Sequence, residues 1–250
     1  MNKEAAKELM LKMADDALIY GHRLSEWTGI GPILEEDIAF SSISQDKVGH
    51  AWQLYQLLEV DFGTPNPDQM GFERKENEYK CSRLNEFYTR DYAFALIRHF
   101  FMDHAEFIRY SLLRASSYEA LAQLAKKVRG EIKYHVLHAD TWIKKLGTAT
   151  EESHSRMQAA LNEAFPYALG IFEPGPFEQE LIDSGIFIGE EQLRAEWLDE
   201  IRPLIEESGL QLPSTTNAEM GGRSGYHSDD LAPLLEEMSE VVRSDPEASW

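Results

Sequence analysis

Cysteine and long apolar runs are what this sequence of 250 residues most clearly lacks. Its one cysteine, Cys81, excludes an internal disulfide and any zinc or iron–sulfur site built on several thiolates. The N-terminal segment 1–20 carries acids every few residues, so it is not a signal peptide or a membrane span. We therefore expect a cytoplasmic protein without a membrane partner.

Basic residues are also scarce. The chain has 24 Lys and Arg against 44 Asp and Glu, which gives a formal net charge of −20. Nucleic acids and anionic membranes bind basic patches, so we expect neither as a partner. Two interpretations of the acidity remain open: a basic protein partner, or a charge that only keeps the chain soluble.

Apolar residues recur at helical spacing in most of the chain. Four segments are long enough for helices of roughly 37 Å at 1.5 Å per residue, and an up-down bundle is the economical way to pack them. The predicted helices are 3–27, 34–60, 89–114 and 118–146. The sequence therefore predicts an all-α protein.

Further helices are expected after Gly147. The segment DFGTPNPDQMG before the third long helix is predicted to be a loop, and Ser228 is predicted to cap the last helix. We expect a single domain, 1–250, in which residues 148–250 form a helical extension packed on a core bundle of residues 3–147. The predicted helices of the extension are 151–172, 177–184, 190–208 and 228–243.

Two of the long helices repeat a pattern of an acid followed four residues later by a histidine. One contains DKVGH at 46–50 and the other contains EIKYH at 131–135, and the helix before each carries a further acid. Such acids and histidines are typical of the ferritin-like four-helix bundle, where they surround two iron or manganese ions. The candidate ligand positions are Asp16, Asp46, His50, Asp103, Glu131 and His135.

The pattern departs from that plan at its histidines. A ferritin-like metal site uses Glu-x-x-His on two helices, but Gly49 and Tyr134 stand at the third position here, and His50 and His135 come one residue late. One residue turns a side chain by about 100° around the helix. We predict no bound metal or cofactor and no catalytic residue in this chain, with the six candidates as remnants of ligand positions.

Two alternatives stay open. An acid and a histidine at i and i+4 share a metal in other folds, so the chain could be a self-sufficient di-metal oxidase or oxygenase with a displaced ligand set. The pairs could also be ordinary hydrogen bonds on a helix surface. In a metal-free bundle we expect Asp46, Asp103 and Glu131 to point inward and to be balanced by nearby cations. The candidate cations are Lys47, His50, Lys133 and His135, and a charged His135 beside Glu131 is the simplest local pair.

Three long segments also resemble a known family. They are LSEWTGIGPILEEDIAFSSISQDKVGHA at 24–51, GEIKYHVLHADTWIKKLG at 130–147 and GGRSGYHSDDLAPLLEEM at 221–238, together with the terminal Trp250. The chain is similar to the PaaC-type subunit of the bacterial multicomponent ring-1,2-phenylacetyl-CoA epoxidase, or phenylacetate-CoA oxygenase. It departs from the usual family forms at Ser42, where asparagine is usual, and at Ser228-Asp229, where Thr-Glu is usual.

The resemblance implies a non-catalytic structural subunit. In this family a PaaA-type subunit holds the di-iron site and binds the acyl-CoA, and the PaaC-type subunit pairs with it. The complex inserts one atom of O₂ into the aromatic ring, with electrons from a separate NADPH-dependent reductase. A heteromeric complex with a PaaA-type subunit is thus the expected assembly. Self-association, and a ferritin-like storage or general interaction protein, remain alternatives.

The segment GGRSGYHSDD at 221–230 allows two interpretations. Arg223 and His227 beside a helix N-terminus could contact a phosphate of CoA. Asp229 and Asp230 already occupy that N-terminus, which favours a folded tail that docks on the bundle or on a partner.

Overall fold

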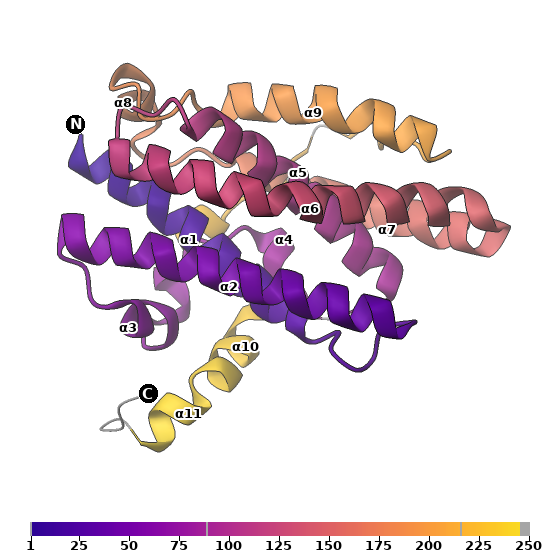
Figure 1. Ribbon diagram of the computed structural model, residues 1–250, viewed down its shortest axis with the longest axis horizontal. Helices are drawn as coiled ribbons and strands as arrows, with labels where there is room; N and C mark the ends of the chain where they lie inside the picture. The colour runs from indigo at the N-terminus through magenta and orange to yellow at the C-terminus, as the bar shows by residue number, and fades with distance from the viewer. Residues whose placement is uncertain (1, 89, 216, 246–250) are drawn as a thin grey trace.

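The computed structural model describes residues 2–88, 90–215 and 217–245, so Trp250 lies outside the described residues. Every regular element in the described residues is helical, and the all-α, ferritin-like prediction is confirmed. The long helices form two antiparallel hairpins, with α1 packed on α2 and α5 packed on α6 (Figure 1). Their bounds are α1 Lys3–Ser25, α2 Leu34–Phe62, α5 Tyr92–Leu113 and α6 Glu119–Ala149.

The remaining elements surround these hairpins. Helices α7 and α9 pack on α5 and α6, whereas α10 and α11 extend away at the bottom of the view (Figure 1). The shorter helices and turns are α3 Pro67–Phe72, α4 Arg83–Glu86, α7 Glu151–Leu169, α8 Glu178–Asp183, α9 Glu190–Glu207, α10 Leu231–Met238 and α11 Glu240–Ser244, with 3₁₀ turns at Glu76–Glu78, Gly170–Phe172 and Gly222–Ser224.

Local side chains explain several helix boundaries. Asn2, Asp91 and Thr150 accept hydrogen bonds from backbone N–H groups in the first turns of α1, α5 and α7. Gly63 ends α2 in the left-handed conformation, with φ of 69°. Gly147 does not end α6, which continues to Ala149. The backbone of Ser208 approaches Gly147 closely, and an added Cβ would meet the Ser208 carbonyl oxygen at 2.3 Å.

Two predictions of local structure were wrong. The expected loop before the third long helix contains α3, because the Asn66 side chain accepts from Gln69 N at 2.9 Å and Pro67 suits the first helical position. The predicted last helix, 228–243, is divided into α10 and α11, and Ser228 does not cap α10, which begins at Leu231 with Asp230 at the N-cap position. The backbone N–H of Ser228 instead donates to Glu86 at 2.6 Å, and that contact holds Ser228 away from the capping position.

Helix α9 is fixed to the bundle by one large apolar contact and one buried ion cluster. Trp197 is fully buried against Phe101 and Phe165, and its Nε1 donates to the Phe101 carbonyl at 3.2 Å. Glu190, at the start of α9, accepts hydrogen bonds from Lys12 Nζ at 2.5 Å and from the two terminal guanidinium nitrogens of Arg109. Burial alone would raise the pKa of Glu190, but Arg109 and Lys12 lower it to about 2.

This ion cluster makes stability depend on acid pH. The pKa of Glu190 lies below its ordinary 4.5, so its stabilisation is present above pH 4.5 and is lost as the pH falls toward 2. We expect Glu190→Gln to lower the free energy of unfolding at pH 7 by roughly 3 kcal/mol, from about 1.4 kcal/mol per pKa unit. Urea unfolding from pH 7 to pH 2.5 should show the deficit shrinking below pH 4.5.

The matched control is Glu191→Gln, because Glu191 is the exposed neighbour in the same turn. It should change the stability by less than about 0.5 kcal/mol. A deficit for Glu190→Gln that stays constant down to pH 2.5 would contradict the assignment of this acid transition to Glu190.

Candidate functional site

A polar layer fills the space between the two hairpins. Lys47 on α2 is fully buried, and its Nζ donates to Asp103 Oδ1 at 2.6 Å and to Glu106, both on α5. The ammonium also lies 5.4 Å from the centre of the Tyr20 ring on α1. A lysine cation therefore occupies the centre of the bundle and links three of its four long helices.

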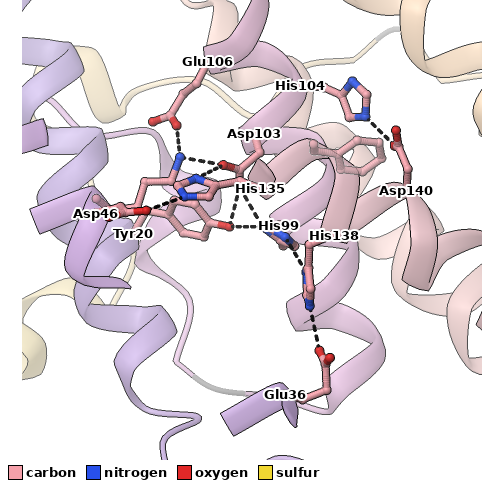
Figure 2. Close-up of polar contacts among 12 residues, drawn as sticks. Tyr20, Glu36, Asp46, His99, Asp103, His104, Glu106, His135, His138 and Asp140 are labelled. Carbon is pink, nitrogen blue, oxygen red and sulfur yellow. Dashed lines mark hydrogen bonds and ion pairs between the residues drawn. The ribbon is translucent and has the colours of Figure 1, made fainter. Parts of the chain in front are cut away.

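Asp103 is the hub of this layer, as Figure 2 shows. Oδ1 accepts from Lys47 and also lies 3.1 Å from His135 Nδ1. Oδ2 accepts from the Tyr20 hydroxyl at 3.0 Å and from His99 Nδ1 at 2.7 Å. Each carboxylate oxygen thus has two partners, so its hydrogen-bonding capacity is filled by the chain itself.

Charge in the centre follows these contacts. Burial alone lowers the pKa of Lys47, but Asp103 and Glu106 together raise it above its ordinary value. Burial raises the pKa of Asp103, yet Lys47 and His99 bring it well below its ordinary range. For Glu106, the effect of burial exceeds the opposing effect of the Lys47 charge, so its pKa is raised above its ordinary value. Lys47 and Asp103 therefore form the stable ionised pair.

A chain of hydrogen bonds leads from this centre toward one end of the bundle (Figure 2). Burial lowers the pKa of His99 to about 4, so its imidazole is neutral near pH 7. His99 Nε2 lies 3.0 Å from His138 Nδ1, and His138 Nε2 lies 2.9 Å from Glu36, which also accepts from Tyr92. Because the neutral His99 ring donates from Nδ1 to Asp103, its Nε2 accepts from His138.

Two acid–histidine pairs join α2 to α6. His135 Nε2 lies 2.9 Å from Asp46, and its Nδ1 lies 3.1 Å from Asp103. His50 Nε2 lies 2.7 Å from Glu131. Burial and then the charge of Lys47 lower the pKa of His50 to about 2, so this ring is neutral and its Nδ1 has no hydrogen-bond partner.

The predicted site residues fall in three places. Asp103 points inward as expected, but the expectation was wrong for Asp46 and Glu131, whose side chains are 46% and 38% exposed. The expected local pair of His135 with Glu131 was also wrong, because both residues pair across helices instead. Asp16 makes no contact with Asp103 or Lys47 among the described hydrogen bonds: it accepts from Arg223 at 2.7 Å and from Ser82 N at 2.6 Å.

Sequence reasoning missed most of the polar layer. Lys47 appeared only as one of several cations that could balance the acids, and the missed residues are Tyr20, Glu36, His99, Glu106 and His138. A signal was present, because His99, Asp103 and Glu106 lie at i, i+4 and i+7 in a helix rich in aromatic residues. That spacing predicts a polar stripe turned toward the core.

This arrangement does not fit a dinuclear metal centre. The ligand capacity of Asp103 is filled by side chains, and a buried ammonium stands between it and Glu106. Tyr134, at one expected histidine position, is 68% exposed. Gly49, at the other, has no side chain to offer.

One other group of potential metal ligands exists in the described residues, formed by Cys81, Glu86 and His227. Internal hydrogen bonds occupy it: Glu86 lies 2.7 Å from His227 Nδ1, and His227 Nε2 lies 3.1 Å from the Tyr79 carbonyl. Burial raises the pKa of the Cys81 thiol well above its usual range, which disfavours the thiolate that binds metals. The group holds the C-terminal segment against α4.

Arg223 and His227 are likewise used inside the chain. Arg223 is buried, and its guanidinium donates to Asp16 and to the carbonyl oxygens of Lys80 and Ile171. The side chain of His227 is fully buried. Neither residue presents a donor to a phosphate, so these contacts favour the folded tail over a site for CoA.

Removing the central cation should destabilise the fold. We expect Lys47→Met to lower the free energy of unfolding by about 3–5 kcal/mol, because Asp103 is left as a buried, unpaired charge. Adding Asp103→Asn to Lys47→Met should recover part of the loss. Chemical denaturation monitored by circular dichroism measures both.

The control is Lys133→Met, since Lys133 is an exposed lysine of α6. It should shift the stability by less than about 0.5 kcal/mol. Equal losses for the two lysine variants would mean that Lys47 does not hold the bundle together.

Comparison with known proteins gives two matches. The family described as phenylacetic acid catabolic protein matches residues 1–250. One of the subunits of the 1,2-phenylacetyl-CoA epoxidase of Escherichia coli (strain K12) is 29% identical over 240 residues, which cover 96% of this chain and 97% of that protein. Within the described residues, none of the helices has both the length and the apolar character needed to cross a membrane.

Proposed function

The chain belongs to the phenylacetic acid catabolic protein family, and we propose that it is the structural subunit of a phenylacetyl-CoA ring epoxidase. The similarity to a subunit of the E. coli epoxidase supports this, since it extends over nearly the full length of both chains. In this proposal a PaaA-type partner holds the di-iron site and the acyl-CoA, and this chain binds that partner without taking part in the chemistry.

The buried ammonium of Lys47 is the observation that carries the non-catalytic role. At an effective dielectric constant of 20, a divalent cation about 4 Å from a buried ammonium is repelled by roughly 8 kcal/mol. The carboxylate that would attract a metal, Asp103, is already neutralised by Lys47 and surrounded by His99, His135 and Tyr20. The charge that metal ions provide in a ferritin-like oxidase is thus provided here by a side chain.

Activity measurements test the division of labour. We expect the isolated chain to give no oxidation of phenylacetyl-CoA with an electron donor, and the PaaA-type subunit to need this chain for full activity. The comparison is between the catalytic subunit expressed alone and co-expressed with this chain. Turnover by the isolated chain, or near-stoichiometric iron or manganese that is lost in Glu131→Ala, would instead favour the self-sufficient di-metal oxidase.

A conservative change at Glu131 tests whether this acid takes part in chemistry. Glu131→Gln keeps the shape and the hydrogen bond to His50 while removing a charge that is partly exposed. We expect the complex to assemble and to retain activity within about twofold, because a change of that size corresponds to less than about 0.5 kcal/mol. An assembled but inactive Glu131→Gln complex would contradict the structural role.

A further inference from the structure

Helices α2 and α6 lie side by side at one face of the bundle and present a continuous outer surface (Figure 1). Contacts of Asp46 with His135, His50 with Glu131, and Gln53 with Lys127 fix them as an antiparallel pair. We call the outward sides of these two helices the α2–α6 face. Its central residues are Ile38, Ser42, Gly49, Gly130, Tyr134 and Leu137.

Large apolar side chains are exposed on this face. Ile38 on α2 is 58% exposed, and Tyr134 and Leu137 on α6 are 68% and 61% exposed. Single exposed apolar residues are common on soluble proteins. Several of them gathered on two adjacent helices are instead the usual sign of a protein interface.

Two glycines on the same face have no role in internal packing. A Cβ added to Gly49 or Gly130 would meet nothing within 4 Å, whereas one added to Gly21 would meet Lys47 Cβ at 3.1 Å. A glycine inside a helix destabilises it by about 0.5–1 kcal/mol relative to alanine. The packing of the chain itself does not require glycine at either position. Close packing of a helix from another protein against this face would require it.

The charges on the face are divided between the two helices. The one basic residue of α2 is the buried Lys47, so the exposed charges of α2 are all acidic. Helix α6 is rich in bases although the chain carries a net charge of −20. Its basic residues are Lys126, Lys127, Arg129, Lys133, Lys144 and Lys145, of which Arg129 contacts Ser111 of α5 and Lys144 pairs with Glu207 of α9 instead.

This division requires a partner with the reverse arrangement, a basic surface over α2 and an acidic one over α6. A subunit built on the same helical plan, docked about a two-fold axis, would place its counterpart of α2 over α6. A face as long as a 29-residue helix and two helices wide, about 43 by 20 Å, covers roughly 800 Å², which is the share of one partner in a standard-sized interface.

We infer that the α2–α6 face is where this chain binds the catalytic subunit. The inference rests on the proposed function, because it assigns that partner to a surface. The catalytic subunit presents a pair of long helices, its side chains surround Tyr134 and Leu137, and its backbone approaches most closely at Gly49 and Gly130. Lysines of α6 and acids of α2 form the polar rim.

Co-purification with an affinity-tagged PaaA-type subunit tests the inference. Two variants change the face in different ways: Gly130→Leu fills the gap left by the missing side chain, and Leu137→Glu puts a charge in its apolar part. Each should reduce the amount of this chain retained by the tagged subunit at least tenfold. The isolated Gly130→Leu chain should melt no lower than the parent, because leucine favours a helix more than glycine does.

The matched control is Ile182→Glu, which puts the same charge at an exposed apolar residue of α8, away from the face. It should be retained within twofold of the parent. Retention of both face variants at the level of the parent overturns the inference. It is also overturned if the variants convert a dimer of the isolated chain to monomers and leave co-purification intact, because the face then binds a second copy. A parent chain that is not retained at all refutes the proposed function instead.

Discussion

The bundle depends on one buried cation. Lys47 reaches from α2 into the space between the hairpins, and taking an ammonium out of water is tolerated only with compensating charge and hydrogen bonds. Asp103 and Glu106 supply that charge, and the need to satisfy Asp103 in turn positions Tyr20 and two histidines. The polar layer is therefore a single connected system in which each group is held by the next.

Such a layer contributes specificity more than raw stability. A well-packed apolar core of the same volume is often as stable as a buried ion pair. Apolar side chains, however, would allow the hairpins to slide or rotate, whereas the ion pair and its hydrogen bonds are satisfied at one relative position. Metal ions fix the same geometry in a ferritin-like oxidase. In this chain the Lys47 ammonium and its hydrogen bonds hold the centre of the bundle.

The amino-acid sequence predicts the helices of this fold better than it predicts their rotation. Periodicity and capping residues locate the four long helices, and the two acid–histidine pairs indicate the ferritin-like plan. The spacing of residues along one helix does not reveal which side of that helix faces the bundle axis. Asp46 was therefore expected inside the bundle, although it lies at the seam with α6. One residue later, about 100° around α2, Lys47 takes the inward direction. The partners of His50 and His135 lie on other helices, and spacing within a helix does not reveal them.

The polar centre and the outer face of the bundle are linked through the seam between α2 and α6. Asp46 and Glu131 are partly exposed there, and each contacts a buried histidine, His135 or His50. The contacts that satisfy the buried charge thus also fix how far apart α2 and α6 lie and how each is turned. The core of a protein interface is packed as closely as a protein interior. The small and large side chains of the α2–α6 face can match another protein only if the distance between these two helices is fixed. The constraint in the centre thereby determines the shape that the surface offers to a partner.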